Sequence, residues 1–236
     1  MLSRDVFGDY ISLVGSYGWV MMDTAEPRKT YHHGNLVEEL ISATITLIEE
    51  KGFDAVSVRE VAKRAGVSPG APFRHFANKA ALMTAVAEQA MARLTASVLH
   101  ERAVCGSDDP VEELRAVARG YLLWALANPT HFDVIASRTL IDFHGSERLT
   151  TENEAIRLAM VDMIARAQAS GRISAAMPPD ALMLMARAFI YGLCRMWIDG
   201  HFREWRVAKP AEQAMSEAVE LFIDMIGGRY SALPPR

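Results

Sequence analysis

Hydrophobic residues recur at helical spacing along much of the chain, whereas runs of β-branched residues are short. This periodicity favours helices throughout. The first periodic run predicts an amphipathic helix over residues 35–51, with Asn35 as its N-cap and Gly52 as its terminator. The apolar side of that helix would consist of Leu36, Val37, Leu40, Ile41, Thr44, Leu47 and Ile48.

A second, shorter helix is expected to begin after Ser57 and to end at Gly66. Ser57 followed three residues later by Glu60 is typical of a capping box. Ala62 is small enough to allow a close helix crossing. The segment GVSPGAPFRHFANK follows, and it predicts a tight turn and a further short helix beginning at Pro69 or Gly70. A long periodic run from Asn78 to about His100 comes next.

The C-terminal half shows four or five more periodic segments, separated by loop signals such as Asn128-Pro129, Gly171 and Pro178-Pro179. The fold class is therefore expected to be all-α, with two domains over residues 28–78 and 79–236. Residues 1–27 are expected to be a poorly structured extension, or upstream sequence preceding a start at Met21 or Met22. The C-terminal helices are predicted at residues 110–127, 130–143, 148–171, 179–200 and 211–227.

Composition adds a charge pattern to this picture. The chain has 236 residues and a net charge of −4, so it is acidic overall. Between Ser57 and Lys79, however, five Lys or Arg residues stand against Glu60 alone. Positive charge gathered in one short segment of an acidic protein indicates a polyanion partner, the alternative being an ordinary solvated face. Cys105 and Cys194 lie far apart without metal-ligand spacing, which favours a reducing cytoplasm.

A helix-turn-helix motif would account for the prolines and glycines of the cationic segment. Two short helices joined by a tight glycine turn form a helix-turn-helix, whose second helix enters the DNA major groove. Gly66 supplies a left-handed turn, and Pro69 and Pro72 fall in a first helical turn, where proline is tolerated. The free N–H groups of that turn favour a phosphate. Phe76, Val67 and the ring edge of Phe73 are expected to pack back onto the first helix of the motif.

The stretch NLVEELISATITLIEEKGFDAVSVREVAKRAGVSPGAPFRHFANKAALMTAVAEQA resembles the DNA-binding domain of the tetracycline-repressor (TetR) family. The resemblance implies a homodimer of all-α subunits that binds a double-stranded DNA operator and carries a variable, ligand-binding C-terminal domain. It implies that Phe73, His75 and Lys79 contact phosphate. Arg28 and Lys29, which precede the first helix, are candidates for a basic arm in the neighbouring minor groove, the alternative being a disordered segment. The DNA-binding positions that it implies are Ser57, Val58, Arg59, Ser68, Pro69, Gly70, Ala71, Phe73, Arg74, His75 and Lys79.

One departure concerns Phe73, because many members of the family have tyrosine there. Phenylalanine cannot donate a hydrogen bond, so a phosphate contact worth roughly 1 kcal/mol is missing. Arg74 is a candidate substitute. Arg59 is the best candidate for reading a guanine.

Further along, YLLWALANPTHFDVIASR resembles a C-terminal domain type of this family named for a Trp-His-Gly pattern, although Arg187 and Tyr191 stand at that pattern's Trp and His. Aromatic and Met residues here suit a mostly apolar small-molecule effector, the alternative being plain core. Arg187 would serve a charged effector or an interfacial ion pair. The last two helices carry apolar stripes that predict a homodimer interface. The candidate pocket residues are Trp124, His131, Phe132, Phe143, Met160, Met163, Arg187, Phe189 and Tyr191.

Two other function classes are less consistent with the sequence. An enzyme or ligand-storage protein lacks support because no phosphate loop, dinucleotide-binding glycine pattern or zinc spacing occurs. His32 and His33 are adjacent and have no evident third metal ligand. A DNA-packaging protein would be expected to be basic overall. We therefore expect a cytoplasmic, ligand-responsive repressor without catalytic residues, cofactor, metal or membrane association.

Overall fold

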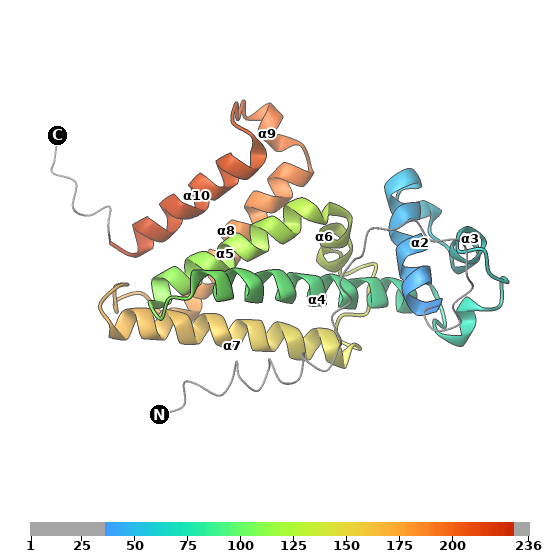
Figure 1. Cartoon of the computed structure of the whole chain (residues 1–236), viewed down its shortest axis with the longest axis horizontal. Coiled ribbons are helices and arrows are strands. Elements are labelled where there is room, and N and C mark those ends of the chain that lie inside the picture. The colour runs from blue at the N-terminus through green and yellow to red at the C-terminus, as the bar shows by residue number, and fades with distance from the viewer. Residues whose placement is uncertain (1–35, 229–236) are drawn as a thin grey trace. The chain divides into compact units, whose positions relative to one another are not determined.

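The computed structural model describes residues 36–228, and these form helices joined by turns, without a strand in that range (Figure 1). The all-α fold class is confirmed. Asn35, Arg28, Lys29, His32, His33 and the predicted extension over residues 1–27 lie outside the described range. The elements are α2 (Leu36–Lys51), η1 (Phe53–Ala55), α3 (Val58–Arg64), η2 (Pro72–Arg74), α4 (Lys79–Cys105), α5 (Pro110–Ala127), α6 (Pro129–Ala136), α7 (Glu147–Ala169), α8 (Pro179–Ile198), α9 (His201–Glu204) and α10 (Ala211–Ile226).

Packing divides these residues into two compact units. The first unit comprises residues 36–87 and 134–146, and the second comprises residues 88–133 and 147–228. Helix α4 begins in the first unit and ends in the second, so the two units share one continuous helix.

Local sequence signals account for the first helices. The backbone of Gly52 has φ 79°, and its N–H donates to the carbonyl of Ile48 at 2.7 Å, which ends α2. The hydroxyl of Ser57 accepts a hydrogen bond from the N–H of Glu60 at 3.2 Å, so the predicted N-cap of α3 is confirmed. The inner face of α3, with Val61 and Ala62 fully buried, packs against α2.

Four predicted helices differ from the structure. The long helix expected from Asn78 to about His100 continues to Cys105. The segment after Gly66 contains only the 3₁₀ turn η2, because its two prolines and Gly70 leave few residues able to continue an intrahelical hydrogen-bond ladder. The helix expected over residues 130–143 ends at Ala136, and turns follow it. The helix expected over residues 179–200 ends at Ile198, where Gly200 has φ 81° and separates α8 from α9.

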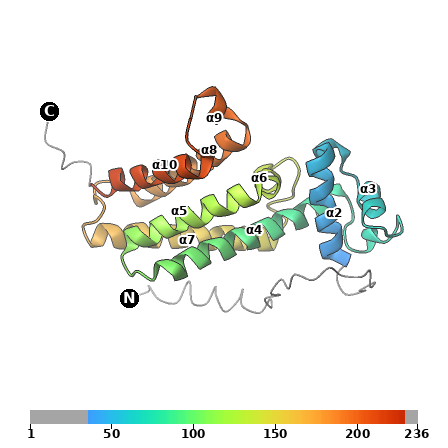
Figure 2. The same ribbon diagram turned by 45° about the horizontal axis from the view of Figure 1, so that its top comes forward.

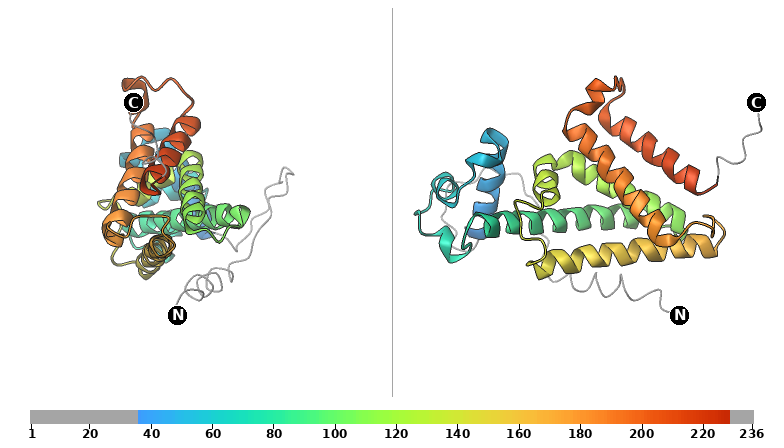
Figure 3. Two further views of the ribbon diagram at one scale, coloured as in Figure 1. Left: turned by 90° about the vertical axis from the view of Figure 1, so that its left-hand side faces the viewer. Right: turned by 180° about the vertical axis from the view of Figure 1, so that it is seen from behind.

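In the second unit, α5 packs against α7, α8 and α10, and α7 also packs against α8 (Figures 1 and 3). Helices α8 and α10 lie side by side (Figure 2). Helices α4 and α5 approach each other closely at Gly120 of α5, whose carbonyl accepts a hydrogen bond from the hydroxyl of Ser97 of α4 at 2.8 Å. A Cβ atom at Gly120 would lie 2.6 Å from the Cα of Val98, so this crossing requires glycine.

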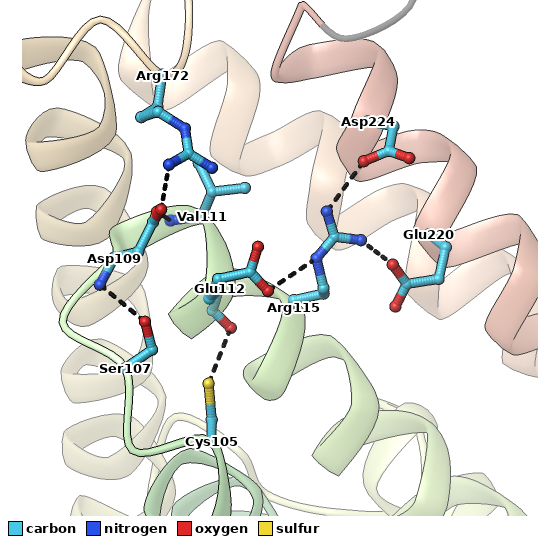
Figure 4. Close-up of polar contacts among 9 residues, drawn as sticks. All are labelled: Cys105, Ser107, Asp109, Val111, Glu112, Arg115, Arg172, Glu220 and Asp224. Atoms are coloured by element: carbon cyan, nitrogen blue, oxygen red, sulfur yellow. Dashed lines mark hydrogen bonds and ion pairs between the residues drawn. The ribbon is translucent and has the colours of Figure 1, made fainter.

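A buried arginine joins α5 to α10. Arg115, which is 8% exposed, forms ion pairs with Glu112 at 3.3 Å, with Asp224 at 3.0 Å and with Glu220 (Figure 4). Two of its three carboxylates come from α10, so the pairs hold that helix onto α5. The same view shows Asp109, whose carboxylate accepts from the N–H of Val111 at 2.9 Å and caps the start of α5.

Helix α8 has an apolar face that its own subunit leaves largely uncovered. The helix is long and apolar enough to cross a membrane by length and composition, yet 11% of its most apolar stretch is buried inside the chain. Leu184 and Met185 of α8 and Leu221 and Met225 of α10 are exposed. Both of these neighbouring helices therefore keep large apolar side chains in contact with water.

Candidate nucleic-acid interface and ligand domain

The cationic turn predicted from the sequence lies on the surface of the first unit. Gly66 has φ 70°, and the N–H of Val67 donates to the carbonyl of Ala62 at 3.0 Å, so the predicted left-handed turn is confirmed. Residues 68–70 and 73–75 are exposed, whereas Pro72 and Phe76 are buried. We call residues 68–75 the tip.

Backbone hydrogen bonds fix the shape of the tip. The N–H of Ala71 donates to the carbonyl of Ser68 at 3.0 Å, and those of His75 and Phe76 both donate to the carbonyl of Pro72 at 2.9 Å. The buried Pro72 and Phe76 thus anchor the turn on both sides of Phe73. Phe73 itself is 50% exposed, so half of its side chain is open to solvent, and the packing of its ring edge onto the first helix of the motif stays a prediction. Pro72 occupies the inner side of the turn.

Positive side chains surround the tip. Arg59 and Lys63 of α3 are exposed, as are Arg74 and His75. Arg64 differs from them, because both of its terminal nitrogens bond the carboxylate of Glu50 at 2.6 Å. That pair lowers the pKa of the Glu50 carboxyl, through the hydrogen bond from Arg64 above all. The positive charge open to a partner is therefore carried by α3 and the tip.

Lys79 has an intramolecular partner. Its ammonium group is partly buried and donates to the carbonyl of Phe53 at 2.8 Å, which ties the start of α4 to η1. An ammonium group has three donors, so two are left for other acceptors. Sequence reasoning missed the cap of α4, where the side-chain oxygen of Asn78 accepts from the N–H of Ala81 at 2.9 Å. Asparagine directly before a helix was the available signal.

In the second unit, several predicted pocket residues form an aromatic cluster with Tyr121. Phe132 of α6 stacks on Tyr191 of α8 with ring centroids 5.5 Å apart, and it lies 6.0 Å from Trp124 of α5. Tyr121 makes edge contacts with Trp124 and Phe132 at 5.8 and 6.4 Å. The guanidinium carbon of Arg187 lies 5.3 Å from the centre of the Tyr121 ring. Sequence reasoning missed Tyr121, although it lies three residues before Trp124 and so shares its helix face.

Apart from the guanidinium of Arg187 at its edge, the polar groups near this cluster are few. The indole nitrogen of Trp124 is buried without a hydrogen-bond partner among the described residues. His131 is buried, and its Nε2 pairs with the side-chain oxygen of Gln89 at 3.0 Å. Burial, with the nearby positive charge of Arg93, lowers the pKa of His131 to about 4, so this imidazole is neutral at pH 7. Burial likewise raises the pKa of Tyr121.

Within residues 36–228, no ring contact joins the other predicted pocket residues to this cluster, apart from that of Arg187 at its edge. Phe143 belongs to the first unit, where the guanidinium of Arg138 lies 4.0 Å from its ring centre. Phe189 stacks on Phe222 of α10, with ring centroids 4.6 Å apart. Arg187 is exposed rather than enclosed by the apolar run around it, because α8 is covered on one side only. On α7, Met163 is buried and Met160 is partly buried.

Two family models match the chain. The model described as bacterial regulatory proteins of the tetR family matches residues 40–86, which contain α2, α3 and the tip. The model described as a tetracyclin repressor-like C-terminal domain matches residues 114–224. The Trp-His-Gly subtype of that domain stays a prediction.

Individual proteins give the same picture. The HTH-type transcriptional regulator BetI of Stenotrophomonas maltophilia is 39% identical over 83 residues, which are 35% of this chain and 42% of that protein. The chain thus aligns with less than half the length of this curated relative. A protein of unknown function from Rhodococcus sp. RHA1 superposes with a TM-score of 0.68 at 24% identity, covering 85% of this chain and 100% of that one. FadR from Bacillus subtilis, solved in complex with stearoyl-CoA, superposes with a TM-score of 0.62 at 15% identity, covering 80% and 97%.

Proposed function

Since the chain belongs to the TetR family of bacterial regulatory proteins, we propose that it is a ligand-responsive transcriptional regulator that binds double-stranded DNA. The observation that carries the proposal is the tip, a surface turn that carries Arg74 and His75 and is bordered by the exposed cations Arg59 and Lys63 of α3. Such a surface is suited to the major groove, where the bases are read. Membership of a family of regulators argues against an enzyme, and the cytoplasm is the compartment that holds the DNA of such a protein.

Contacts to DNA divide into two kinds. Ser57 caps α3 and Arg59 is exposed in its first turn, so both would face the DNA, with Arg59 suited to guanine. Val58 differs from the expectation, because its side chain is buried against the core and leaves only backbone for a DNA contact. The exposed residues Ser68, Pro69 and Gly70, with Ala71, would bring backbone close to the duplex. Arg74, His75 and Lys79 would contact phosphate, which positions the protein without specifying sequence.

We propose a homodimer formed through α8 and α10. Their exposed apolar residues Leu184, Met185, Leu221 and Met225 would be covered by the same residues of a second copy. Two helices from each subunit would then form a four-helix interface. Two tips in a symmetric dimer would be spaced by about 34 Å, one turn of DNA, which implies a near-palindromic operator.

The effector is proposed to be a mostly apolar small molecule that binds at the aromatic cluster of α5, α6 and α8. Four aromatic rings and a neutral His131 favour apolar ligand surface. The fold neighbour FadR was solved with stearoyl-CoA, a molecule with a long apolar chain. Arg187 at the edge of the cluster is placed for an anionic group of such a ligand.

The proposed mechanism is a two-state switch that releases DNA. Helix α4 carries Lys79 at its start and contacts Gly120 of α5 further along, next to Tyr121. A ligand that displaces α5 would therefore displace α4, and with it the DNA-binding tip. A coupling free energy of roughly 1–3 kcal/mol would weaken DNA binding 5- to 150-fold, which supports repression relieved by the effector.

A gel-shift assay with the protein's own upstream region tests the function. Specific retardation that a small molecule reverses is the expected result. Retardation of every fragment alike would instead indicate packaging, and no retardation would favour an enzyme or a storage protein. Arg59→Ala should abolish specific retardation, whereas Arg203→Ala, which removes the same charge from exposed α9, should not.

A further inference from the structure

Phe73 is an unusual residue for a solvent-exposed turn. In the described part of the first unit, the exposed large hydrophobic side chains are Phe73 at 50% and Val37 at 38%. An aromatic ring left half in water gains free energy when a partner covers it. The ring is therefore the apolar feature of a surface that is otherwise made of small and cationic residues.

The inner side of the turn is already occupied, so the Phe73 ring has no space there. Pro72 and Phe76 fill the inner side, and two backbone hydrogen bonds of 2.9 Å to the carbonyl of Pro72 close the turn around Phe73. Rotating Phe73 inward would require Pro72 to leave its buried position. The ring is thus presented outward in advance of binding, at little further entropic cost.

Few groups on a DNA duplex can make a favourable contact with a phenylalanine ring. Phenylalanine has no donor for a phosphate oxygen, and it has no group that pairs with the polar edges of bases. On the floor of the major groove, the C5-methyl group of thymine is the apolar group that base pairs display. The neighbouring cations Arg59 and Arg74 match the phosphates that border such a groove.

We propose that Phe73 is a specificity-determining residue that recognises thymine through contact between its ring and the C5-methyl group. This inference rests on the proposed DNA-binding function. It assigns Phe73 to base reading, in place of the phosphate contact that tyrosine would make. It follows that each half of the operator contains a thymine at one fixed position.

Deoxyuridine provides a test, because it differs from thymidine by the methyl group alone. A high-affinity duplex is first selected from a random-sequence library with the full-length protein. Each thymine of that duplex is then replaced in turn by deoxyuridine, and the Kd is measured by fluorescence anisotropy. We expect one position in each half-site at which the replacement weakens binding about four-fold, the effect of one buried methyl-sized group.

The dependence on Phe73 is tested with two variants of Phe73 and one control variant of Val37. Phe73→Ala should bind the thymine and deoxyuridine duplexes equally, whereas Phe73→Leu should retain most of the difference. Val37→Ala truncates the other exposed apolar side chain of the unit and should leave the four-fold difference unchanged.

The outcomes separate the inference from the function on which it rests. If no specific duplex is selected, the DNA-binding proposal itself is wrong. If a duplex is selected but no thymine shows a methyl effect, or the effect persists in Phe73→Ala, DNA binding stands and the role of Phe73 is wrong.

Discussion

Replacing Gly120 by alanine tests how tightly α5 crosses α4. The new Cβ atom would lie 2.6 Å from the Cα of Val98 and 2.9 Å from its backbone nitrogen. Ordinary van der Waals contact begins near 3.4 Å, so the two helix backbones must separate by about 0.8 Å. Because backbone atoms are in the way, no side-chain rotation relieves the clash. Overpacking of this kind lowers the free energy of unfolding by about 1–3 kcal/mol.

Gly192→Ala in α8 is the matched control, since an added Cβ there meets nothing within 4 Å of the same chain. Alanine is favoured over glycine in a helix, so this variant should gain up to about 1 kcal/mol. Both variants are compared with wild type by urea denaturation followed by circular dichroism. Equal effects of the two substitutions would refute the close crossing, because helix propensity alone would then account for both.

Three further predictions concern His131, Arg115 and Lys79. The pKa of His131 is about 4 in the folded protein and near 6.5 in the unfolded chain, so unfolding takes up a proton between these values. The free energy of unfolding should fall by up to about 1.4 kcal/mol per pH unit as pH drops from 6.5 towards 4, and His131→Gln should lose that slope in urea titrations. Arg115→Leu leaves the carboxylates of α10 without their cation and should lower the free energy of unfolding by about 1–3 kcal/mol, and Arg157→Leu, which breaks the exposed pair of α7, should change it little. Lys79→Ala should weaken all operators alike and reduce the salt slope of binding by about one, and an unchanged slope in anisotropy titrations would remove Lys79 from the phosphate contacts.

Features that depend on a few neighbouring residues were predicted correctly from the sequence. The cap at Ser57, the left-handed Gly66 and the ends of α2 and α5 depend on local backbone chemistry, which short motifs encode. Hydrophobic periodicity over long segments also located α7 and α10 to within a residue or two.

Features that depend on tertiary packing were harder to predict. Periodicity could not show that Pro72 rather than Phe73 turns inward, because both are apolar and adjacent. Phe143 has the composition of a pocket residue but belongs to the other unit, since α6 ends early and a turn follows. The partner of Lys79 is a carbonyl 26 residues away, and sequence patterns carry no information about backbone acceptors at that distance.

The uncovered apolar side of α8 has a consequence during synthesis. The ribosome completes this helix before α10 and the C-terminal residues that follow it, and before a second copy is at hand. In a nascent subunit, the 20-residue apolar helix α8 is therefore exposed to solvent until α10 and a second subunit pack against it. The yield of soluble, folded protein should therefore depend more strongly on chaperone supply and expression rate than on the free energy of unfolding of the completed subunit.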